Sequence, residues 1–421
     1  MTQTIEIKEQ EERLILVGVS VNEQDDVKQS LKELEELAKT AGGITVCKVI
    51  QNRESIHPGT YIGKGKIEEV KILVQEMNAT TVVCDDELSP AQLKNLEQAL
   101  DIKVIDRTVM ILDIFAARAL TREGKIQVEL AQLKYRASRL VGLGSSLSRL
   151  GGGIGTRGPG EKKLEMDRRL IKDRISQLKS ELLDVQKARQ TTRSLRQSQK
   201  IPVVAIVGYT NAGKSTLLNQ LTGAGILAED KLFATLDPTT RNLKLESGQQ
   251  ILLTDTVGFI RKLPHHLIEA FKSTLEEAKY ADIILHVVDA SNPDAQLQME
   301  VVYETLNNLK VEEKPIITAF NKVDMIPPDM IMKDSHADKS LYISAKYGSY
   351  MSKLLECIEE VLLESKVLLD EVLPYSMAGF SQDIRKYGQL ISEEYVQNGI
   401  HVKAYVTKEL FDKIMARKGD K

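Results

Sequence analysis

The stretch PVVAIVGYTNAGKST (202–216) decides the fold of the central part of the chain. Its first half is an apolar run typical of a buried strand, and residues 208–216 follow with the pattern G-x-x-x-x-G-K-S. Glycines let the backbone N–H groups of such a loop surround a phosphate, and the helix that begins there adds its positive end. We therefore predict that Lys214 contacts β- and γ-phosphates and that Ser215 ligates Mg²⁺. The loop consists of Gly208, Tyr209, Thr210, Asn211, Ala212, Gly213, Lys214, Ser215 and Thr216.

A second motif, DTVGF (255–259), ends the apolar run ILLTD. A carboxylate at this place suits Mg²⁺ held through a water molecule, and the N–H of Gly258 can sense the γ-phosphate. The segment LFATLDPTTR (232–241) offers a threonine as a second protein ligand of Mg²⁺, engaged only when the γ-phosphate is present. The predicted ligand is Thr235, with Thr239 and Thr240 as alternatives. The predicted catalytic groups are Lys214, Thr235 and Gly258. Further predicted nucleotide contacts are Phe233, Ala234, Leu236, Asp237, Asp255, Thr256 and Val257.

Two later motifs bear on the choice of base. NKVD (321–324) follows the buried run KPIITAF, and SAK (344–346) follows LYI, where it can close over a base. The Asp324 carboxylate can accept hydrogen bonds from N1–H and the exocyclic amine of guanine, whereas adenine offers no such pair. A site built for paired hydrogen bonds discriminates strongly, so Asp324 favours GTP over ATP. The predicted base contacts are Asn321, Lys322, Val323, Asp324, Ser344, Ala345 and Lys346.

The rest of the chain is organised around this nucleotide-binding region, and 421 residues are enough for two to four cores. The predicted fold class is multidomain α/β, with a P-loop G domain whose mostly parallel sheet carries helices on both faces. The predicted regions are an N-terminal α/β domain (1–120), a basic helical hairpin with a glycine-rich loop (121–199), the G domain (200–366) and a small C-terminal α+β domain (367–421).

Strand-like runs alternate with helical patterns over the first 120 residues, which indicates a small parallel sheet. Ser89 is expected to be the N-cap of a helix. The expected N-terminal strands are 14–19, 44–50, 80–84 and 102–105, with a helix at 27–38. The C-terminal expectation is two strands (388–392 and 399–406) and a helix (408–415).

Region 121–199 shows two helical stripes, one from Ile126 to Ala137 and a longer, coiled-coil-like one from Leu164 to Val185. Eight glycines lie between them within 142–160, so we expect an antiparallel hairpin with an exposed tip, followed by a polar linker at 193–200.

The hairpin region is also basic. Residues 134–200 hold 17 Lys and Arg against 6 Asp and Glu. Intrahelical pairs such as Glu165 with Arg168 explain single charges but not this imbalance, which favours contact with a nucleic-acid backbone. The basic residues considered are Arg136, Arg139, Arg149, Arg157, Lys162, Lys163, Arg168 and Arg169.

Composition limits the remaining possibilities. A formal net charge of -3 predicts no polyanion partner for the chain as a whole. Three distant cysteines indicate neither a disulfide framework nor a zinc site and are typical of a reducing cytosol. The polar start and the lack of an apolar run of about 18 residues predict a soluble cytoplasmic protein without a membrane span. Because no long hydrophobic seam requires a dimer, we expect a monomer.

The ordered set GYTNAGKST, ATLDPTT, DTVGF, NKVD and SAK resembles a translation-factor-type small G domain. The flanking segments TYIGKGKIEE (60–69), DDELSPAQLKNLE (85–97) and SRLGGGIGTRGPGEKKLEMDRR (148–169) resemble the HflX family of ribosome-associated GTPases, as does 105–135. The resemblance covers nearly the whole chain, and only about the last fifty residues match loosely. It implies hydrolysis of GTP to GDP and phosphate, binding to the large ribosomal subunit and its rRNA, and a role in splitting or rescuing stalled ribosomes under heat or antibiotic stress.

Four features leave alternatives open. Phe259 stands where signalling G proteins carry a water-orienting glutamine, so we expect slow hydrolysis until the large subunit stimulates it. Asn211 either helps to hold K⁺ near the phosphates or is an ordinary loop asparagine. The pair His265 and His266 is more consistent with exposure than with catalysis. The turn at 63–66 is more consistent with a tight turn or an rRNA contact than with a second nucleotide site.

Three function classes follow. The first is a ribosome-stimulated GTPase that splits or rescues ribosomes, partly ribosome-bound in the cytoplasm. The alternative is a GTP-switched ribosome-assembly factor that acts mainly as a binding module. An RNA-modification partner or an ATP-driven helicase is the third class, and Asp324 together with the single complete nucleotide site argues against the helicase.

Overall fold

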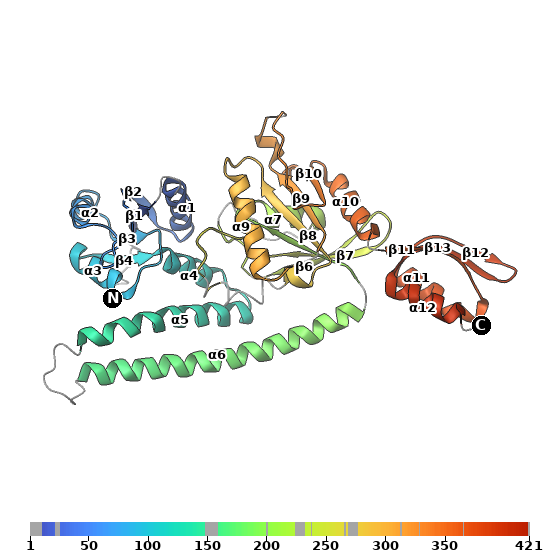
Figure 1. Cartoon of the computed structure of the whole chain (residues 1–421), viewed down its shortest axis with the longest axis horizontal. Coiled ribbons are helices and arrows are strands. Elements are labelled where there is room, and N and C mark those ends of the chain that lie inside the picture. Colours follow the sequence, from blue (N-terminus) through green and yellow to red (C-terminus); the bar gives the residue numbers. More distant parts are fainter. Residues whose placement is uncertain are drawn as a thin grey trace, which may run out of the picture. The chain divides into compact units, whose positions relative to one another are not determined.

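The computed structural model of the chain (Figure 1) forms two compact units. One contains residues 1–185, 230–237 and 260–272, and the other contains 186–229, 238–259 and 273–421. The residues described are 11–21, 26–147, 159–198, 201–223, 232–236, 238–264, 267, 277–311, 314–327, 329–364 and 366–419. The sequence-based proposals for Arg149, Arg157, Asp237, His265 and His266 therefore lie outside the described residues.

The N-terminal sheet has four parallel strands in the order β2-β1-β3-β4. Its central strand β1 buries six consecutive residues, as expected for a parallel strand with both faces covered. The four predicted strands are present, with ends shifted by at most two residues, and Ser89 caps α3 in a capping box with Gln92. The elements are β1 (Arg13–Ser20), α1 (Val27–Thr40), β2 (Ile44–Asn52), α2 (Lys64–Glu76), β3 (Thr81–Cys84), α3 (Pro90–Leu100), β4 (Lys103–Asp106) and α4 (Arg107–Arg118).

The predicted hairpin consists of α5 (Arg122–Leu147) and α6 (Pro159–Ser198), which run side by side in Figure 1. Ile126 and Leu130 of α5 form a buried cluster with Leu178 of α6. The predicted loop at 142–160 is too long, because α5 continues through two of its glycines. Each helical glycine costs only about 1 kcal/mol relative to alanine. The predicted linker at 193–200 is likewise helical up to Ser198, since extending an existing helix is cheap.

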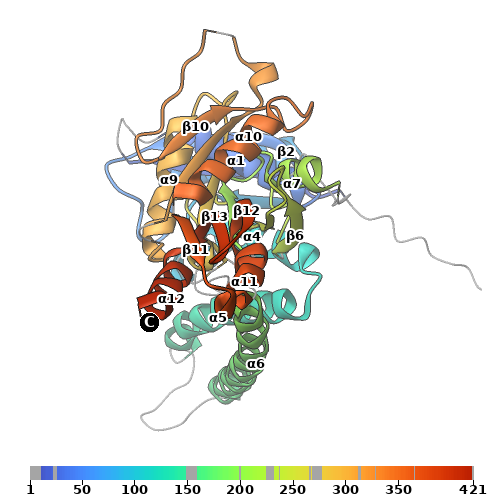
Figure 2. The same ribbon diagram turned by 90° about the vertical axis from the view of Figure 1, so that its right-hand side faces the viewer.

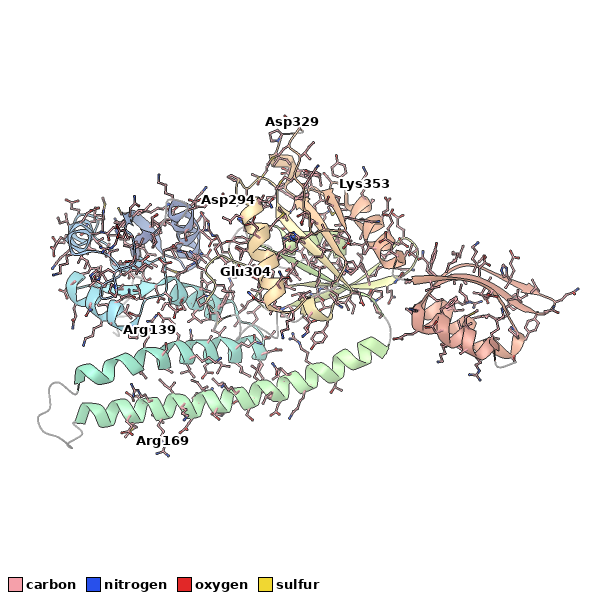
Figure 3. All side chains as sticks on the ribbon, in the orientation of Figure 1. Arg139, Arg169, Asp294, Glu304, Asp329 and Lys353 are labelled. Carbon is pink, nitrogen blue, oxygen red and sulfur yellow. The ribbon has the colours of Figure 1, made fainter. Side chains whose placement is uncertain are left out.

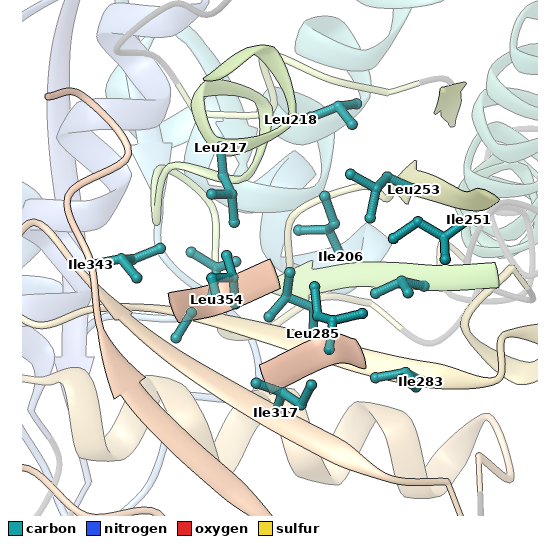
Figure 4. Close-up of a cluster of buried hydrophobic side chains, with 14 of the residues drawn as sticks. Ile206, Leu217, Leu218, Ile251, Leu253, Ile283, Leu285, Ile317, Ile343 and Leu354 are labelled. Carbon is teal, nitrogen blue, oxygen red and sulfur yellow. The ribbon is translucent and has the colours of Figure 1, made fainter. Parts of the chain in front are cut away.

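The second unit contains a six-stranded sheet in the order β10-β9-β8-β5-β7-β6, parallel except for the β6–β7 pair. Leucine and isoleucine side chains from the sheet, α7 and α10 form its core, as Figure 4 shows. The elements are β5 (Val203–Gly208), α7 (Lys214–Thr222), β6 (Thr239–Lys244), β7 (Gln250–Asp255), β8 (Ile283–Asp289), α9 (Ala295–Asn308), β9 (Ile316–Asn321), η2 (Val323–Met325), β10 (Lys339–Tyr342) and α10 (Met351–Glu364).

The C-terminal segment forms an antiparallel sheet in the order β11-β13-β12. Burial alternates along β13, whose inward residues form a core with residues of α11 and α12, the two helices beside the sheet in Figure 2. The predicted pair of strands and the final helix are present, but β11 and α11 were not predicted. The elements are β11 (Lys366–Leu373), η3 (Tyr375–Met377), α11 (Gly379–Tyr387), β12 (Gln389–Val396), β13 (Gly399–Thr407) and α12 (Lys408–Gly419).

Candidate functional site: a nucleotide-binding loop and a base-recognition corner

The loop between β5 and α7 has a backbone that requires glycine at two positions. Gly208 has φ +153°, and a Cβ there would lie 2.3 Å from the Val287 carbonyl oxygen. Gly213 has φ +98°, and a Cβ there would lie 2.2 Å from Nδ2 of Asn321. A side chain at either glycine would clash with β8 or β9. The loop backbone can therefore lie close to these strands and expose its N–H groups.

Lys214 is buried at the start of α7. Its ammonium donates hydrogen bonds to the carbonyl oxygens of Gly208 at 3.1 Å and Tyr209 at 2.8 Å. Burial lowers the pKa of Lys214 to about 8, while the charge of the nearby Asp255 acts to raise it. The buried ammonium therefore loses its proton more easily than an exposed lysine does, and a bound phosphate would raise the pKa again.

Ser215 and Asp255 bring two oxygen ligands together. Ser215 Oγ donates a hydrogen bond to Oδ2 of Asp255 at 2.7 Å, joining the start of α7 to the end of β7. Hydroxyl and carboxylate oxygens are the hard ligands that Mg²⁺ prefers, and Mg²⁺ usually keeps several waters, so this pair fits the predicted metal. Within the described residues no cluster of three or more His, Cys, Asp or Glu is arranged to hold a metal.

The other predicted Mg²⁺ ligand belongs to a different part of the structure. Thr235 and its described neighbours, 232–236, belong to the compact unit that contains the N-terminal sheet. There the Phe233 ring packs edge-on against Phe115 of α4, with centroids 4.6 Å apart. Of the alternatives, Thr239 begins β6, and the Thr240 hydroxyl hydrogen-bonds to that of Thr254 at 3.0 Å, as an ordinary sheet pair.

The DTVGF motif contacts the loop through its backbone. The Phe259 N–H donates to the Gly208 carbonyl at 3.1 Å, and the Phe259 carbonyl accepts from the Thr210 N–H at 2.8 Å. A Cβ at Gly258 would lie 2.9 Å from the Lys214 ammonium, so this glycine permits the close approach. The Phe259 side chain is buried, and it cannot orient a water molecule. The Thr256 hydroxyl donates to the Ile206 carbonyl, and Val257 is buried, so both have structural roles here.

The base-recognition motifs are tied to each other and to the loop. Asn321 Nδ2 donates to the Ala212 carbonyl at 2.8 Å, and Asn321 Oδ1 accepts from the Ala345 N–H at 2.9 Å. Ser344 Oγ donates to Oδ1 of the exposed Asp324 at 2.5 Å. Three segments far apart in sequence thus meet in one corner, with a carboxylate held in a fixed direction.

Asp289, at the end of β8, is a residue of this corner that no sequence motif predicted. It accepts a hydrogen bond from the Lys322 ammonium at 2.7 Å, and Lys322 has φ +63°. The only sequence signal for Asp289 was a carboxylate at the end of a buried strand.

The remaining predicted residues frame the loop. Tyr209 and Thr210 are buried, Val323 and Thr216 are partly exposed, and Lys346 lies over the ring of Tyr347. Asn211 is exposed and has φ +62°, a conformation that asparagine tolerates well. This backbone conformation is consistent with an ordinary loop asparagine, and it does not test K⁺ binding. Gly63 caps α2, and its N–H donates to the Gln51 side chain at 2.8 Å, consistent with a tight turn.

The basic hairpin offers fewer free cations than its composition indicated. Arg139 donates to Oδ2 of Asp106 at 2.6 Å and to the Leu88 carbonyl, so it is committed to holding α5 against the N-terminal sheet. Arg168 donates to the Leu140 carbonyl at 2.6 Å. Arg136 and Arg169 are exposed, and Figure 3 shows Arg169 projecting from α6.

Family comparisons agree with this geometry. Residues 28–116 match the family described as GTP-binding GTPase N-terminal, 118–196 match GTP-binding GTPase Middle Region, and 203–322 match 50S ribosome-binding GTPase. The loop, the Ser215–Asp255 pair and the base-recognition corner, on a mostly parallel sheet, define a P-loop GTPase.

Relatives identify the family. The chain is 67% identical to GTPase HflX of Lacrimispora saccharolytica, over 98% of this chain and 97% of that one. It is 50% identical to GTPase HflX of Caldanaerobacter subterraneus, over 97% and 94%, and 43% identical to GTPase HflX of Escherichia coli, over 83% of each. The chain belongs to the HflX family of GTPases.

One solved structure, a GTP-binding protein from Sulfolobus solfataricus in complex with GDP, is 26% identical and covers 84% of this chain and 99% of that chain, with a TM-score of 0.45. Among the described residues, no helix has both the length and the apolar character needed to cross a membrane.

Proposed function

We propose that this GTPase binds GTP in the loop 208–216 and recognises guanine through Asp324, and that it acts on the large ribosomal subunit to split or rescue stalled ribosomes. The observation that carries the nucleotide assignment is the corner in which Asn321 bridges the loop and the SAK motif while Ser344 orients Asp324. A fixed carboxylate beside a phosphate loop is the arrangement that selects guanine.

The proposed residue roles combine this placement with the sequence motifs, and the role of Thr235 rests on its motif alone. Lys214 neutralises charge on the β- and γ-phosphates, and the Gly258 N–H, beside that ammonium, contacts the γ-phosphate. Ser215, with Asp255 through water, would hold Mg²⁺, and the motif predicts Thr235 as a further ligand. The bound metal would neutralise phosphate charge. Catalysis of this kind depends on positioning and electrostatics rather than on a protein nucleophile.

Hydrolysis in the isolated protein should be slow. Phe259 is buried in the place after Gly258, so the chain offers no side chain there to orient the attacking water. We expect the large subunit to complete the site and to raise turnover at least tenfold, a barrier change of about 1.4 kcal/mol. Phosphate release should be measured with and without saturating large subunits. Equal rates would contradict ribosome stimulation.

The ribosomal role requires a separate test. Ribosomes sedimented with the protein and GTP, GDP or a non-hydrolysable analogue should dissociate into subunits in a nucleotide-dependent manner. Stable association with a precursor large subunit, without dissociation of complete ribosomes, would instead support the assembly-factor alternative.

Potassium can be tested independently. If Asn211 helps to hold K⁺ near the phosphates, GTP hydrolysis should be faster in KCl than in NaCl at equal ionic strength, and Asn211→Ala should abolish the difference. Equal rates in the two salts would leave Asn211 as a loop residue alone.

A further inference from the structure

Asp289 ends β8 and holds the lysine of the NKVD motif. Its Oδ2 accepts a hydrogen bond from the Lys322 ammonium at 2.7 Å. Its Oδ1 accepts from the backbone N–H of Ser291 at 3.0 Å and from the Ser291 hydroxyl at 2.6 Å. Because both carboxylate oxygens are engaged, the carboxylate has a fixed direction and offers the ammonium one fixed position.

The backbone at Lys322 directs the lysine side chain toward β8. Asp289 and Asn321 are register partners at the ends of the parallel strands β8 and β9, which lie side by side in Figure 1. Lys322 then has φ +63°, a left-handed conformation that residues other than glycine rarely adopt. After this turn, the Val323 N–H donates to the Ile343 carbonyl, which follows β10, at 3.2 Å. The main chain thus turns toward β10, whereas the lysine side chain extends the opposite way, to β8.

The order of the strands places this side chain between the two parts of the nucleotide site. In the order β10-β9-β8-β5, the SAK motif follows β10, NKVD begins at the end of β9, and the phosphate loop begins at the end of β5. Neighbouring strands are about 4.8 Å apart. The Lys322 side chain therefore spans one strand spacing of the path from Asp324 to the phosphate loop. A nucleotide that is held at both ends has to lie along this path.

Charge pairing and partial exposure suit the lysine to a supporting role. The side chain of Lys322 is 25% exposed, and that of Asp289 is 13% exposed. The methylene stem of a lysine can cover an apolar surface while its ammonium stays with a polar partner. Because Asp289 holds the ammonium before the nucleotide arrives, the lysine has already lost much of its rotamer freedom, and binding does not have to order it.

We propose that Asp289 is a positioning residue for guanine binding, which fixes the Lys322 side chain so that its methylene stem covers one face of the base while Asp324 binds the edge. The proposal rests on the proposed guanine site and deepens it, because it assigns support of the base to a residue outside the nucleotide motifs. Loss of the Asp289 charge releases the ammonium, and the nucleotide itself then has to order the lysine.

The test measures GTP binding by full-length variants. Asp289→Asn keeps an oxygen for Ser291 but removes the charge, and the Kd for GTP should rise about tenfold. Lys322→Met keeps a stem without its anchor and should give a similar rise. The double variant should bind no more weakly than either single variant, because both substitutions remove one interaction. Losses that multiply to about 100-fold would overturn the proposal, since Asp289 would then act on the nucleotide independently of Lys322.

Two further measurements separate positioning of the base from damage to the fold. The loss in Asp289→Asn should appear in the KM for GTP and not in kcat, because the groups around the phosphates are unaltered. Tripolyphosphate fits the phosphate loop but carries no base, so its inhibition constant should be the same in Asp289→Asn as in the unaltered protein. Weaker inhibition by tripolyphosphate would indicate a damaged loop and would overturn the proposal. Lys322→Arg can keep the pair with Asp289 and should retain most of the GTP affinity.

Lys339→Met is the matched control. The Lys339 ammonium donates to Glu360 at 2.6 Å, and the side chain is 29% exposed, against 25% for Lys322. Lys339 begins β10, which is parallel to β9, so it lies at the amino edge of the sheet, away from the nucleotide motifs. Its substitution should leave the Kd for GTP unchanged, and a loss equal to that in Lys322→Met would overturn the proposal.

Failure of the guanine site and failure of this inference are distinguishable. If the proposed guanine site were wrong, the unaltered protein would bind ATP as tightly as GTP. If the protein prefers GTP but Asp289→Asn binds it with unchanged affinity, only the role of Asp289 is refuted.

Discussion

At the scale of single residues, Asp324 is the one that we propose selects guanine, through its carboxylate. Asp324→Asn replaces an acceptor by a donor, and we expect GTP affinity to fall at least 100-fold, since two charge-assisted hydrogen bonds contribute about 1.5–3 kcal/mol each. Affinity for xanthosine triphosphate should rise, because its additional carbonyl accepts from the asparagine amide. Titrations with both nucleotides measure the exchange.

Asp329→Asn is the matched control for this substitution. Asp329 is another exposed aspartate after NKVD, labelled in Figure 3. Its substitution should leave both affinities unchanged. Undiminished GTP affinity in Asp324→Asn would remove this residue from the base site.

Lys214 should link nucleotide binding to pH. Burial lowers its pKa to about 8, whereas phosphates favour the charged form and raise the pKa again. Above about pH 8 the free protein has lost this proton and must take it up on binding, so affinity should fall by up to about tenfold per pH unit. Below pH 7 the lysine is already charged and the effect disappears. Calorimetry at pH 9 in two buffers of different ionisation enthalpy should give different heats, and identical heats would contradict the shift.

The sequence predicted those site residues that lie together within one continuous motif. The loop 208–216 and Asp324 stand in motifs whose spacing carries their chemistry, and the structure brings Asn321, Ala212 and Ala345 together. Asp289 was missed because its partner Lys322 lies 33 residues away, and no spacing rule connects the two. The ion pair between Arg139 and Asp106 also depends on tertiary packing. Composition alone therefore predicted that Arg139 was available to bind nucleic acid.

At the scale of elements, the N-terminal strands could be predicted because strands buried on both faces give continuous apolar runs in the sequence. The continuous apolar run of β1 predicted a parallel strand correctly, whereas β11 was missed. Its exposed face mixes Leu368 with Asp370, and charged residues interrupt the alternation that would indicate a strand. The glycine-rich loop was predicted to begin too early, at residue 142, whereas α5 continues to Leu147, because glycine content alone does not end a helix.

The hairpin should depend on its small apolar seam. Leu178 is buried against Ile126 and Leu130, so Leu178→Ala should lower the free energy of unfolding by about 2–4 kcal/mol through lost burial and a cavity. Leu183, on the same helix, is 56% exposed, and Leu183→Ala should change stability by less than about 0.5 kcal/mol. Urea unfolding followed by circular dichroism measures both. Similar losses for the two variants would show that the seam is not the stabilising contact.

At the scale of the whole molecule, two neighbouring strands of the N-terminal sheet each present an acid that fixes another part of the chain. Asp85, after β3, holds Lys262 beyond the DTVGF motif, and Asp106, at the end of β4, accepts from Tyr135 at 2.9 Å and from Arg139 of the hairpin. Arg107, beside Asp106 in the chain, in turn pairs with Asp85. The carboxyl edge of one small sheet therefore connects the hairpin to the segment after DTVGF, within a single compact unit.

The exposed charges of the hairpin should contribute to ribosome binding through counterion release. Arg169 and Lys172 are exposed on α6, and we expect replacement of both by glutamine to weaken binding to the large subunit several-fold. The slope of log K against log salt should become shallower by about 1.5, because each phosphate contact contributes roughly 0.7–0.9. The matched control removes two charges elsewhere, at Lys48 and Lys103, which pair with Glu35 and Glu12. Because neither pair of substitutions touches the nucleotide loop, hydrolysis without ribosomes should be unchanged in both variants. If the control flattens the salt dependence as much as the α6 variant does, the attraction belongs to the overall charge of the protein and not to the hairpin.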